Sequence, residues 1–443
     1  MYALLGWCAL VALGRAVPAQ GPARLADVRG PNVLSDRAAP VAAPGDTIRL
    51  TRRAAIAEAL ARNPQIEIAR QQTAQARARR VQGIAIPDPA LVASYDEQTR
   101  LFGLGTAGSR PVSLDLAVPF PDKFRLQNRI GTADIGSFES NFVLQRQLVA
   151  FQTSAAYDSL LVAQRHRADL QEGLLLASDF LKRTQARYAA GTAAKLDVIK
   201  AQVDVAQARN DLIASERDVA TAEASLNRQL GRDISAPITP ADSLDVPPPL
   251  PDSSEIDRIA LANRPELAIL QNQQRGAAAN TALAREYWLP DLTVGISRDY
   301  ALPGSPLFTT GIALPLPAFF WQHTNGEIAA SAHFERELAA TYRDTRAQVV
   351  QDVRSAYASA STAMRQVTFI RDELVPSARE AFRVATTSYT LGGASALEVL
   401  DARRALLDAE SQLADALADA NTSRADLERA LGVPIQSLGA SNR

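Results

Sequence analysis

Few residues of this sequence have types and spacings that could do chemistry. The three histidines, His166, His323 and His333, lie in no His-x-x-x-His or carboxylate-rich spacing, which a metal site built on them would need. The sequence also lacks a glycine-rich phosphate loop, a nucleophile elbow and a paired set of catalytic carboxylates. We therefore predict that the protein is not an enzyme and holds neither a metal ion nor a cofactor.

Two acidic residues near the C-terminus share a spacing that a helix would place on one side. Glu398 and Asp401 lie three positions apart, so on a helix they share one face. Ser395 precedes Glu398 at the spacing of a capping box, which by itself explains an acid at position 398. Asp401 has no such explanation.

The elements that must position these acids occur twice in the chain. The stretch from Tyr188 to Gly231 returns as Tyr389 to Gly432, and Asp401 matches Lys200 in the other copy. Each copy is typical of a helix end, a tight turn at a glycine and a second long helix. Apolar residues recur every seven positions along that second helix: Val198, Val205, Leu212, Val219 and Leu226, and then Val399, Leu406, Leu413, Ala420 and Leu427. This period predicts helices that supercoil around neighbours.

Composition narrows the class of protein. A net charge of −1 over 443 residues gives no indication of nucleic-acid binding. The single cysteine, Cys8, lies in an N-terminal apolar run that ends at a small-residue cleavage site, so we predict a signal peptide over 1–19. Beyond it no apolar run reaches about 18 residues, which excludes a membrane-spanning helix.

Four segments alternate apolar and small or polar residues and are predicted to be strands. They occur in two pairs, each of which ends in closely spaced prolines, and each strand is about ten residues long, the length that crosses an outer membrane when tilted. Four strands cannot close a barrel, and unpaired edges in lipid are costly. The chain must then oligomerise to close a barrel. Two, three or four copies would give eight, twelve or sixteen strands, and the strand count alone does not choose among them. The predicted strands cover 89–98, 110–119, 290–299 and 307–316.

The predicted organisation follows the duplication. It places an irregular leader before the first repeat, a proline-rich linker between the repeats, and a short tail at the end. Long helices over roughly 123–188 and 322–389 lead to tip turns near residues 191 and 392. The boundaries are 20–48 for the leader, 49–236 for the first repeat, 237–251 for the linker, 252–432 for the second repeat and 433–443 for the tail.

In this order of elements the chain resembles the TolC-type outer-membrane efflux proteins across essentially all of the predicted mature sequence. The resemblance rests on the duplicated order, on Arg62-Asn63-Pro64 and Asn263-Arg264-Pro265, and on the Tyr-x-x-Gly turns followed by Leu-Asp-Val and Leu-Glu-Val. It implies a mixed α and β membrane fold: a homotrimer with a twelve-stranded transmembrane β-barrel, four strands per chain, continued by a long α-helical coiled-coil barrel in the periplasm.

The resemblance also implies roles for residues at the two turns. Ala190, Gly191 and Thr192, and likewise Leu391, Gly392 and Gly393, match the family's tip motif, which receives a periplasmic membrane-fusion adaptor. The need of a tight turn for glycine accounts for Gly191 and Gly392 without any docking role.

Three further roles at the second turn follow from the same resemblance. Glu398 and Asp401 match acids that face the pore, where three copies would form stacked rings of carboxylates. Because the capping box accounts for Glu398 by itself, Asp401 is the stronger candidate for this role. Tyr389 matches a tyrosine that helps to hold the tip closed, and Ala394 stands where its arginine partner is expected.

We interpret the chain as the outer-membrane channel of a tripartite efflux system in a Gram-negative-type bacterium. It would be a passive conduit in outer-membrane lipid for small molecules or metal ions, driven by an inner-membrane pump through the adaptor. Two alternatives stay open. A type I protein secretion channel shares the fold and differs in cargo. A soluble periplasmic coiled-coil adaptor or scaffold explains the seven-residue period but leaves the four strands without a role.

Overall fold

The computed structural model describes residues 48–94, 111–286, 289–299, 308–314 and 320–435. The chain divides into two compact units, Met1–Asp46 and Thr47–Arg443, and every described residue belongs to the second. The predicted signal peptide, the leader up to residue 47 and the tail from residue 436 therefore lie outside the described residues.

Capping and proline positions explain where the first helices begin and end. The Thr51 side chain accepts a hydrogen bond from the Ala54 amide at the start of α1, and the Asn63 side chain caps α2 in the same way. Pro64 occupies the first turn of α2, where its missing N–H costs nothing. The first half contains α1 (Arg52–Arg62), α2 (Pro64–Gly83), β2 (Ala90–Ala93), β3 (Pro111–Val118), α3 (Pro121–Ala189) and α4 (Lys195–Leu230).

The second half presents a similar order of elements with one difference. The helix predicted over 322–389 is not a single α-helix, because a π-helical turn, η2 (Ile370–Leu374), interrupts it. Pro376 follows within the first turn of the next helix, and a proline inside a helix removes a hydrogen bond and clashes with the preceding turn. The elements are α5 (Ile256–Asn263), α6 (Pro265–Arg285), β5 (Leu292–Asp299), β6 (Phe308–Ala313), α7 (Phe320–Phe369), η2, α8 (Val375–Leu391) and α9 (Ala396–Leu431).

The strands of both halves join in one antiparallel sheet with the order β2-β3-β5-β6. The central pairing is between β3 and β5, where Asp115 lies opposite Gly295 and Leu114 lies opposite Ile296. In the described strands, β2 and β6 form the edges of this sheet. Each of the four strands of this sheet lies within one of the predicted ranges.

Register sorts the side chains of this sheet by polarity. Residues that lie opposite one another share a face, and one face is apolar apart from Arg298 and Thr310. It carries Leu91, Ala93, Val112, Leu114, Leu116, Val118, Leu292, Val294, Ile296 and Ile312, among others. The opposite face carries small and polar residues, including Ser113, Asp115, Ala117, Thr293, Gly295, Ser297, Thr309, Gly311 and Ala313.

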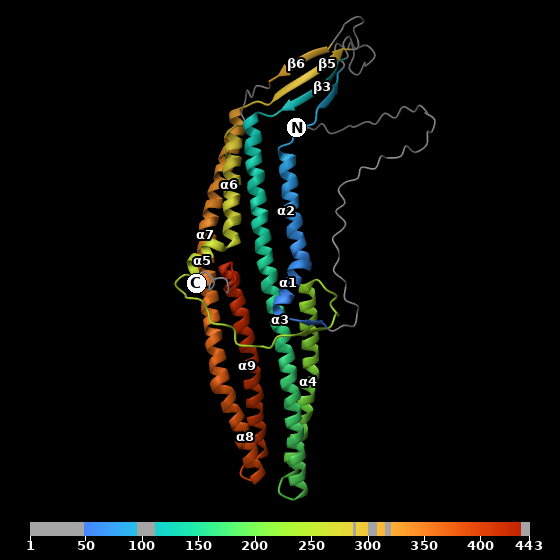
Figure 1. Ribbon diagram of the computed structural model, residues 1–443, viewed down its shortest axis with the longest axis vertical. Helices are drawn as coiled ribbons and strands as arrows, with labels where there is room; N and C mark the ends of the chain where they lie inside the picture. The colour runs from blue at the N-terminus through green and yellow to red at the C-terminus, as the bar shows by residue number, and fades with distance from the viewer. Residues whose placement is uncertain (1–47, 95–110, 287–288, 300–307, 315–319, 436–443) are drawn as a thin grey trace, which may run out of the picture. The chain divides into compact units, whose positions relative to one another are not determined.

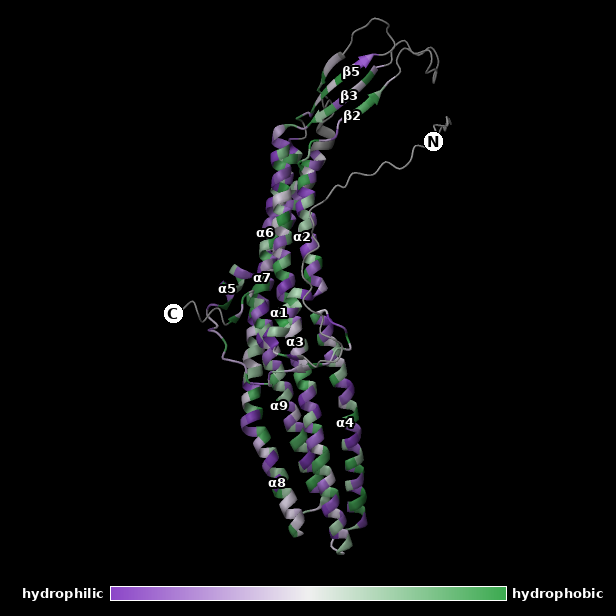
Figure 2. Ribbon diagram, turned by 45° about the vertical axis from the view of Figure 1, so that its right-hand side comes forward, coloured by the Kyte–Doolittle hydropathy of each residue, from purple (hydrophilic) through white to green (hydrophobic). Residues whose placement is uncertain are grey.

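The helices lead away from this sheet and end in two hairpin turns at the opposite end of the unit (Figure 1). Hydrophobic and hydrophilic residues are interleaved along them (Figure 2), as expected for helices that bury a narrow stripe. The buried side chains form several separate clusters along the helices, including one around Tyr157 and one around Val353. In the described helices, none is both long and apolar enough to cross a membrane.

A second, smaller sheet joins the beginning and the end of the first half. β1 (Ile48–Leu50) pairs in parallel with β4 (Ile238–Pro240), which lies at the start of the predicted linker. The segment that precedes the first half is thus paired with the segment that follows it.

Candidate functional site at the helical tips

Two glycine turns close the hairpins at the end away from the sheet (Figure 1). Gly191 has a φ angle of 75° and Gly392 one of 81°, which residues with a side chain rarely adopt. The Gly191 amide donates to the Tyr188 carbonyl at 2.9 Å, and the Gly392 amide donates to the Tyr389 carbonyl at 3.1 Å. The six residues assigned to the tip motif are all exposed: Ala190, Gly191, Thr192, Leu391, Gly392 and Gly393.

Tyr389, at the end of α8, is buried against α3 of the other hairpin with 3% of its surface exposed. Its ring packs on Phe180, with the ring centroids 5.2 Å apart. Its hydroxyl donates to Thr184 Oγ1 at 3.3 Å. The Arg187 guanidinium stands over the same ring, 4.4 Å from its centroid, and Arg187 Nη1 donates to the Tyr389 carbonyl oxygen. One aromatic ring and one arginine thus fasten α8 to α3.

Tyr389 therefore has an arginine partner, Arg187, at a position that the family resemblance did not indicate. Position 394, where the partner was expected, is Ala394. Arg187 comes instead from the last turn of α3. A second donor of the same guanidinium, Nη2, reaches the Thr192 carbonyl at 3.3 Å, so Arg187 holds its own turn as well as the neighbouring hairpin.

A hollow of about 410 Å³ lies between the two turns. Both hairpins contribute to it, and its charged side chains are one arginine and one aspartate. It is lined by Arg187, Gly191, Thr192, Ala193, Ala194, Asp197, Tyr389, Ala394, Ser395 and Ala396.

The two candidate acids differ in their surroundings. The predicted capping box is confirmed: the Glu398 amide donates to Ser395 Oγ at 3.3 Å, and the Glu398 carboxylate accepts from the Ser395 amide and hydroxyl at 3.3 and 2.9 Å. Asp401 is exposed and forms no ion pair with any described residue. The carboxylate of Asp401 is therefore available to ions in the surrounding water, whereas that of Glu398 already caps its own helix.

A buried ion pair joins the hairpins two residues along α9 from Asp401. Arg403 of α9 donates Nη2 to Asp204 of α4, and the two side chains are only 6% and 4% exposed. Arg403 Nη1 also donates to the Gly173 carbonyl of α3 at 3.3 Å. A Cβ atom on Gly173 would lie 3.1 Å from the Leu407 side chain, so a larger residue there would require Leu407 to shift by a few tenths of an ångström.

The sequence analysis named Tyr389 but missed its partner Arg187 and the Asp204–Arg403 pair, although the duplication contains a signal for these three residues. Arg187 matches Ser388 in the second copy, and Asp204 matches Ala405. Arg403 matches Gln202 in the first copy. The linking residues thus stand where the two copies differ in charge, as Asp401 and Lys200 also do.

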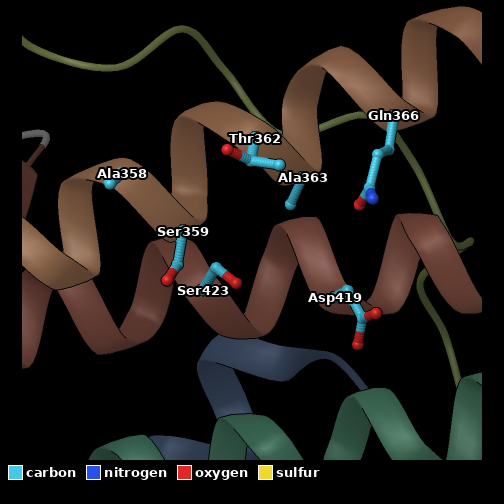
Figure 3. Close-up of a pocket in the computed structure, with 7 residues that line it drawn as sticks. All are labelled: Ala358, Ser359, Thr362, Ala363, Gln366, Asp419 and Ser423. Carbon is cyan, nitrogen blue, oxygen red and sulfur yellow. The ribbon is translucent and has the colours of Figure 1, made fainter.

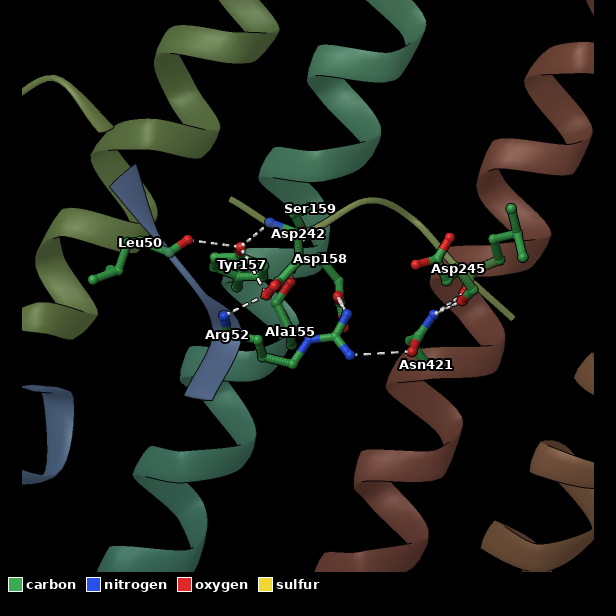
Figure 4. Close-up of polar contacts among 10 residues, drawn as sticks. Leu50, Arg52, Ala155, Tyr157, Asp158, Ser159, Asp242, Asp245 and Asn421 are labelled. Carbon is green, nitrogen blue, oxygen red and sulfur yellow. Dashed lines mark hydrogen bonds and ion pairs between the residues drawn. The ribbon is translucent and has the colours of Figure 1, made fainter. Parts of the chain in front are cut away.

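A polar network higher on the helices ties both halves to the linker (Figure 4). The Arg52 guanidinium donates to Asp158 of α3 and, at 3.2 Å, to Asn421 Oδ1 of α9. Asp158 is only 1% exposed. Burial raises the pKa of the Asp158 carboxyl to about 6, with the charge of Arg52 acting in the opposite direction.

The same network holds the linker on α3 and α9. The Tyr157 hydroxyl donates to the Leu50 carbonyl at 2.8 Å and to Asp242 Oδ2 at 3.1 Å. Asn421 Nδ2 donates to the Asp245 carbonyl at 3.1 Å. Burial raises the pKa of Tyr157 to about 12, so this hydroxyl stays a donor at physiological pH.

A groove of about 370 Å³ between α7 and α9 offers little chemistry (Figure 3). Its lining holds a single charged side chain, that of Asp419, among small and hydroxyl residues. The others are Ala358, Ser359, Thr362, Ala363, Gln366 and Ser423.

No group of three His, Cys, Asp or Glu side chains that could hold a metal ion occurs within the described parts of the chain. His166 lies 3.4 Å from the Asp415 carboxylate and is 31% exposed. His333 is exposed, and the side chain of His323 lies outside the described residues.

Comparisons with known proteins agree with this architecture. CusC, solved in a study of folding and transmembrane channel formation, has the same fold, with a TM-score of 0.75 over 87% of this chain and 93% of its own at 20% identity. The cobalt-zinc-cadmium resistance protein CzcC of Cupriavidus metallidurans is 26% identical over 286 residues, 63% of this chain and 67% of CzcC. The pyoverdine export outer membrane protein OpmQ of Pseudomonas putida is 28% identical over 263 residues, 55% of each chain.

The matched sequence spans about half to two thirds of the length of these curated relatives. A profile of the family described as outer membrane efflux protein covers more of the chain, because it matches both halves, at residues 55–232 and 258–433. The chain therefore belongs to the outer membrane efflux protein family.

Proposed function

We propose that the chain is the outer-membrane channel of a tripartite efflux system. Three copies would form a passive conduit that exports small molecules or metal ions from the periplasm when docked to a periplasmic adaptor and an inner-membrane pump. The observation that carries this proposal is the sheet: it has one apolar face, one small and polar face, and two unpaired edges. Such a sheet fits a wall between lipid and water.

The sheet edges support a trimer with a closed barrel. β2 and β6 each leave one row of backbone donors and acceptors unpaired within the described chain, and in lipid each unpaired group costs several kcal/mol. Pairing β6 of one copy with β2 of the next removes both edges. Three copies of four strands then give twelve strands, with the helices of each copy continuing the wall into the periplasm as a coiled-coil barrel.

The tips support docking and gating at the periplasmic end. The six residues of the two tip motifs are exposed, as contact with an adaptor requires. Arg187 and Tyr389 join the two hairpins of one chain beside these turns, which suits a closed tip that must be loosened before transport. The similar order of elements in the two halves, together with the matched residues, supports a duplication of one ancestral unit.

The acids on α9 support a preference for cations at the tip. In a trimer, Asp401 would contribute three carboxylates at one level and Glu398 three more one turn away, and rings of carboxylates favour cations. We expect Asp401→Asn to lower the cation-to-anion permeability ratio more than Glu398→Gln, because the Glu398 carboxylate is engaged in its capping box. Reversal potentials in planar bilayers measure both, and equal ratios for Asp401→Asn and the unaltered protein would contradict this role.

The proposal is tested by extracting the protein from membranes, weighing the purified oligomer and recording from it in a planar bilayer. A detergent-dependent trimer with small, gated conductance is the expected result. A protein that is soluble without detergent and conducts no ions would instead support a periplasmic scaffold. The cargo of CzcC and of OpmQ, as their names state it, differs, so the proposal covers small molecules and metal ions alike; export of a polypeptide would be seen as secretion dependent on this chain.

A further inference from the structure

The polar face of the sheet carries a carboxylate far from the tips. Asp115 on β3 lies opposite Ala90 on β2 and Gly295 on β5, and Gly295 lies opposite Gly311 on β6. These four residues form one row across the sheet. On both sides of Asp115 the row therefore offers only small residues.

The backbone of β5 makes room for this carboxylate. A Cβ atom added to Gly295 would lie 2.3 Å from Asp115 Oδ1, so the carboxylate occupies the space of the absent side chain. At Gly311 an added Cβ would meet nothing within 4 Å, so the surface next to the carboxylate is open. Ser113 Oγ donates to Asp115 Oδ2 at 3.0 Å and fixes its orientation.

Other charges on this face are few. In the described strands, the one further charged residue of the polar face is Asp299, which lies at the end of β5 and has a contact of its own. Arg298 belongs to the opposite face by register. Across the described part of this face, no cation lies beside Asp115 in the register to neutralise it.

We infer that Asp115 sets the charge preference of the pore at the level of the membrane, separately from the acids at the tip. This inference rests on the proposed trimeric channel, in which the polar face lines the lumen. Three copies then place three carboxylates at one height, each held by Ser113 and open toward the lumen over Gly295 and Gly311. The carboxylates concentrate cations and disfavour anionic solutes on the exit path.

The size of this effect depends on salt. The Debye length is about 30 Å at 10 mM salt and about 3 Å at 1 M, so the three charges act across a wide lumen only when salt is low. Coulomb's law in water, with these charges on the order of 10 Å from the axis, gives an enrichment of cations of roughly two- to fourfold at 10 mM. At 1 M the enrichment disappears.

The test reads the local potential directly and does not depend on the narrow tip. Ser297 lies opposite Ser113, on the same face and two residues along β5 from Gly295. In a Cys8→Ser background, which removes the single native cysteine, the Ser297→Cys variant of the full-length trimer is labelled from outside with a cationic and an anionic methanethiosulfonate. The ratio of the two rates, measured at 10 mM and at 1 M salt, reports the potential beside Asp115.

The same potential that enriches a monovalent cation roughly two- to fourfold depletes a monovalent anion equally, so we expect Asp115→Asn to lower the ratio of the two rates about four- to sixteenfold at 10 mM salt and to leave it unchanged at 1 M. Asp115→Glu, which keeps the charge, should preserve most of the ratio, and Thr293→Ala serves as a neutral substitution on the same face. An unchanged ratio for Asp115→Asn at low salt would overturn the inference, while a conducting trimer would leave the proposed function intact.

Two further outcomes separate the inference from the function on which it rests. If the Ser297 thiol is not labelled in a conducting trimer, the polar face does not line the lumen and Asp115 has no such role. If the protein forms no trimer and conducts no ions, the proposed channel itself is wrong. Ile312→Cys, on the apolar face that the proposed channel turns toward lipid, should react with neither charged reagent, and rapid labelling there would contradict the assignment of the two faces.

Discussion

The two hairpins share one sequence pattern but differ in how the long helix reaches the tip. In the first, α3 runs without interruption for 69 residues. In the second, the π-turn of η2 separates α7 from α8. Pro376 of the second hairpin matches Leu175 of the first, so a single proline accompanies the difference. π-turns inside α-helices are frequent at functional positions, and here the interrupted hairpin is the one that carries Tyr389 and Asp401.

The difference shows where duplicated copies have specialised. The uninterrupted hairpin supplies one side of each contact between the hairpins. These residues are Phe180, Thr184 and Arg187 on α3 and Asp204 on α4. The interrupted hairpin supplies their partners, Tyr389 and Arg403, and it also carries the acids Glu398 and Asp401. The comparison predicts a rigid and a bendable hairpin, joined by a small number of contacts that can be removed one at a time.

The largest effect is expected from breaking the buried ion pair that joins the hairpins. Arg403→Ala leaves Asp204 buried and unpaired, which costs about 3–5 kcal/mol. Hydrogen exchange in α4 and α9 should rise accordingly, and the exposed neighbour Arg404 provides the control Arg404→Ala. In a double variant, Arg403→Leu with Asp204→Leu, most of the stability should return. A double variant as unstable as the single one would mean that packing, and not the unpaired charge, is at fault.

Exchanging the residues at the matched positions 175 and 376 tests whether the proline causes the difference between the two hairpins. Leu175→Pro should destabilise α3 by about 3 kcal/mol or more, because the first hairpin has no widened turn to accommodate the ring. Leu175 is 72% exposed, so Leu175→Ala controls for the lost side chain and should cost little. In the reverse exchange, Pro376→Leu should allow α7 and α8 to become continuous and should slow hydrogen exchange over Ile370–Leu374. Equal exchange in that segment would show that the π-turn has another cause.

A smaller effect is expected at the network that anchors both hairpins to the linker. The pKa of Asp158 is raised from 3.8 to about 6 in the folded protein, so the folded state binds a proton more readily than the unfolded state between these pH values. Stability should therefore fall as pH rises from about 4 to 6, by roughly 2–3 kcal/mol. Asp158→Asn should flatten the dependence of the thermal midpoint on pH over this range. If the variant showed the same dependence as the unaltered protein, Asp158 would not be its source.

The smallest effect is expected at the tip. Arg187→Ala removes a cation–π contact and two hydrogen bonds to carbonyls, which we expect to cost about 1–2 kcal/mol. Amide exchange at Thr390 to Gly393 should then rise about tenfold or more. Arg183→Ala is the matched control, because Arg183 lies on the same helix and pairs only with its neighbour Asp179 among the described residues. Equal exchange in both variants would show that Arg187 does not fasten the second hairpin.

Local rules allowed part of this structure to be predicted from the sequence. Gly191 and Gly392 predicted the turns, and Ser395 predicted the cap that engages Glu398. Each depends on residues within a few positions of one another, whose capping and backbone preferences act locally.

The contacts between the hairpins could not be predicted in the same way. Arg187 meets Tyr389 across 202 positions, and Arg403 meets Asp204 across 199. Such pairs depend on how the helices cross in space, which the seven-residue period leaves open. The π-turn was missed for a related reason: Pro376 lies inside an otherwise regular helical pattern, which continues through the interruption.

The small sheet between β1 and β4 constrains the order in which the protein can fold. Its partners lie about 190 positions apart, as the Arg52 and Asp242 contact beside it shows. β1 is therefore synthesised early but must wait for the whole first hairpin and the start of the linker before it can pair. Closing a loop of that length carries an entropic cost that grows only slowly with length, so the delay lies in the arrival of the partner strand. The first half of the chain therefore reaches its final fold only when β4, which belongs to the linker, pairs with β1.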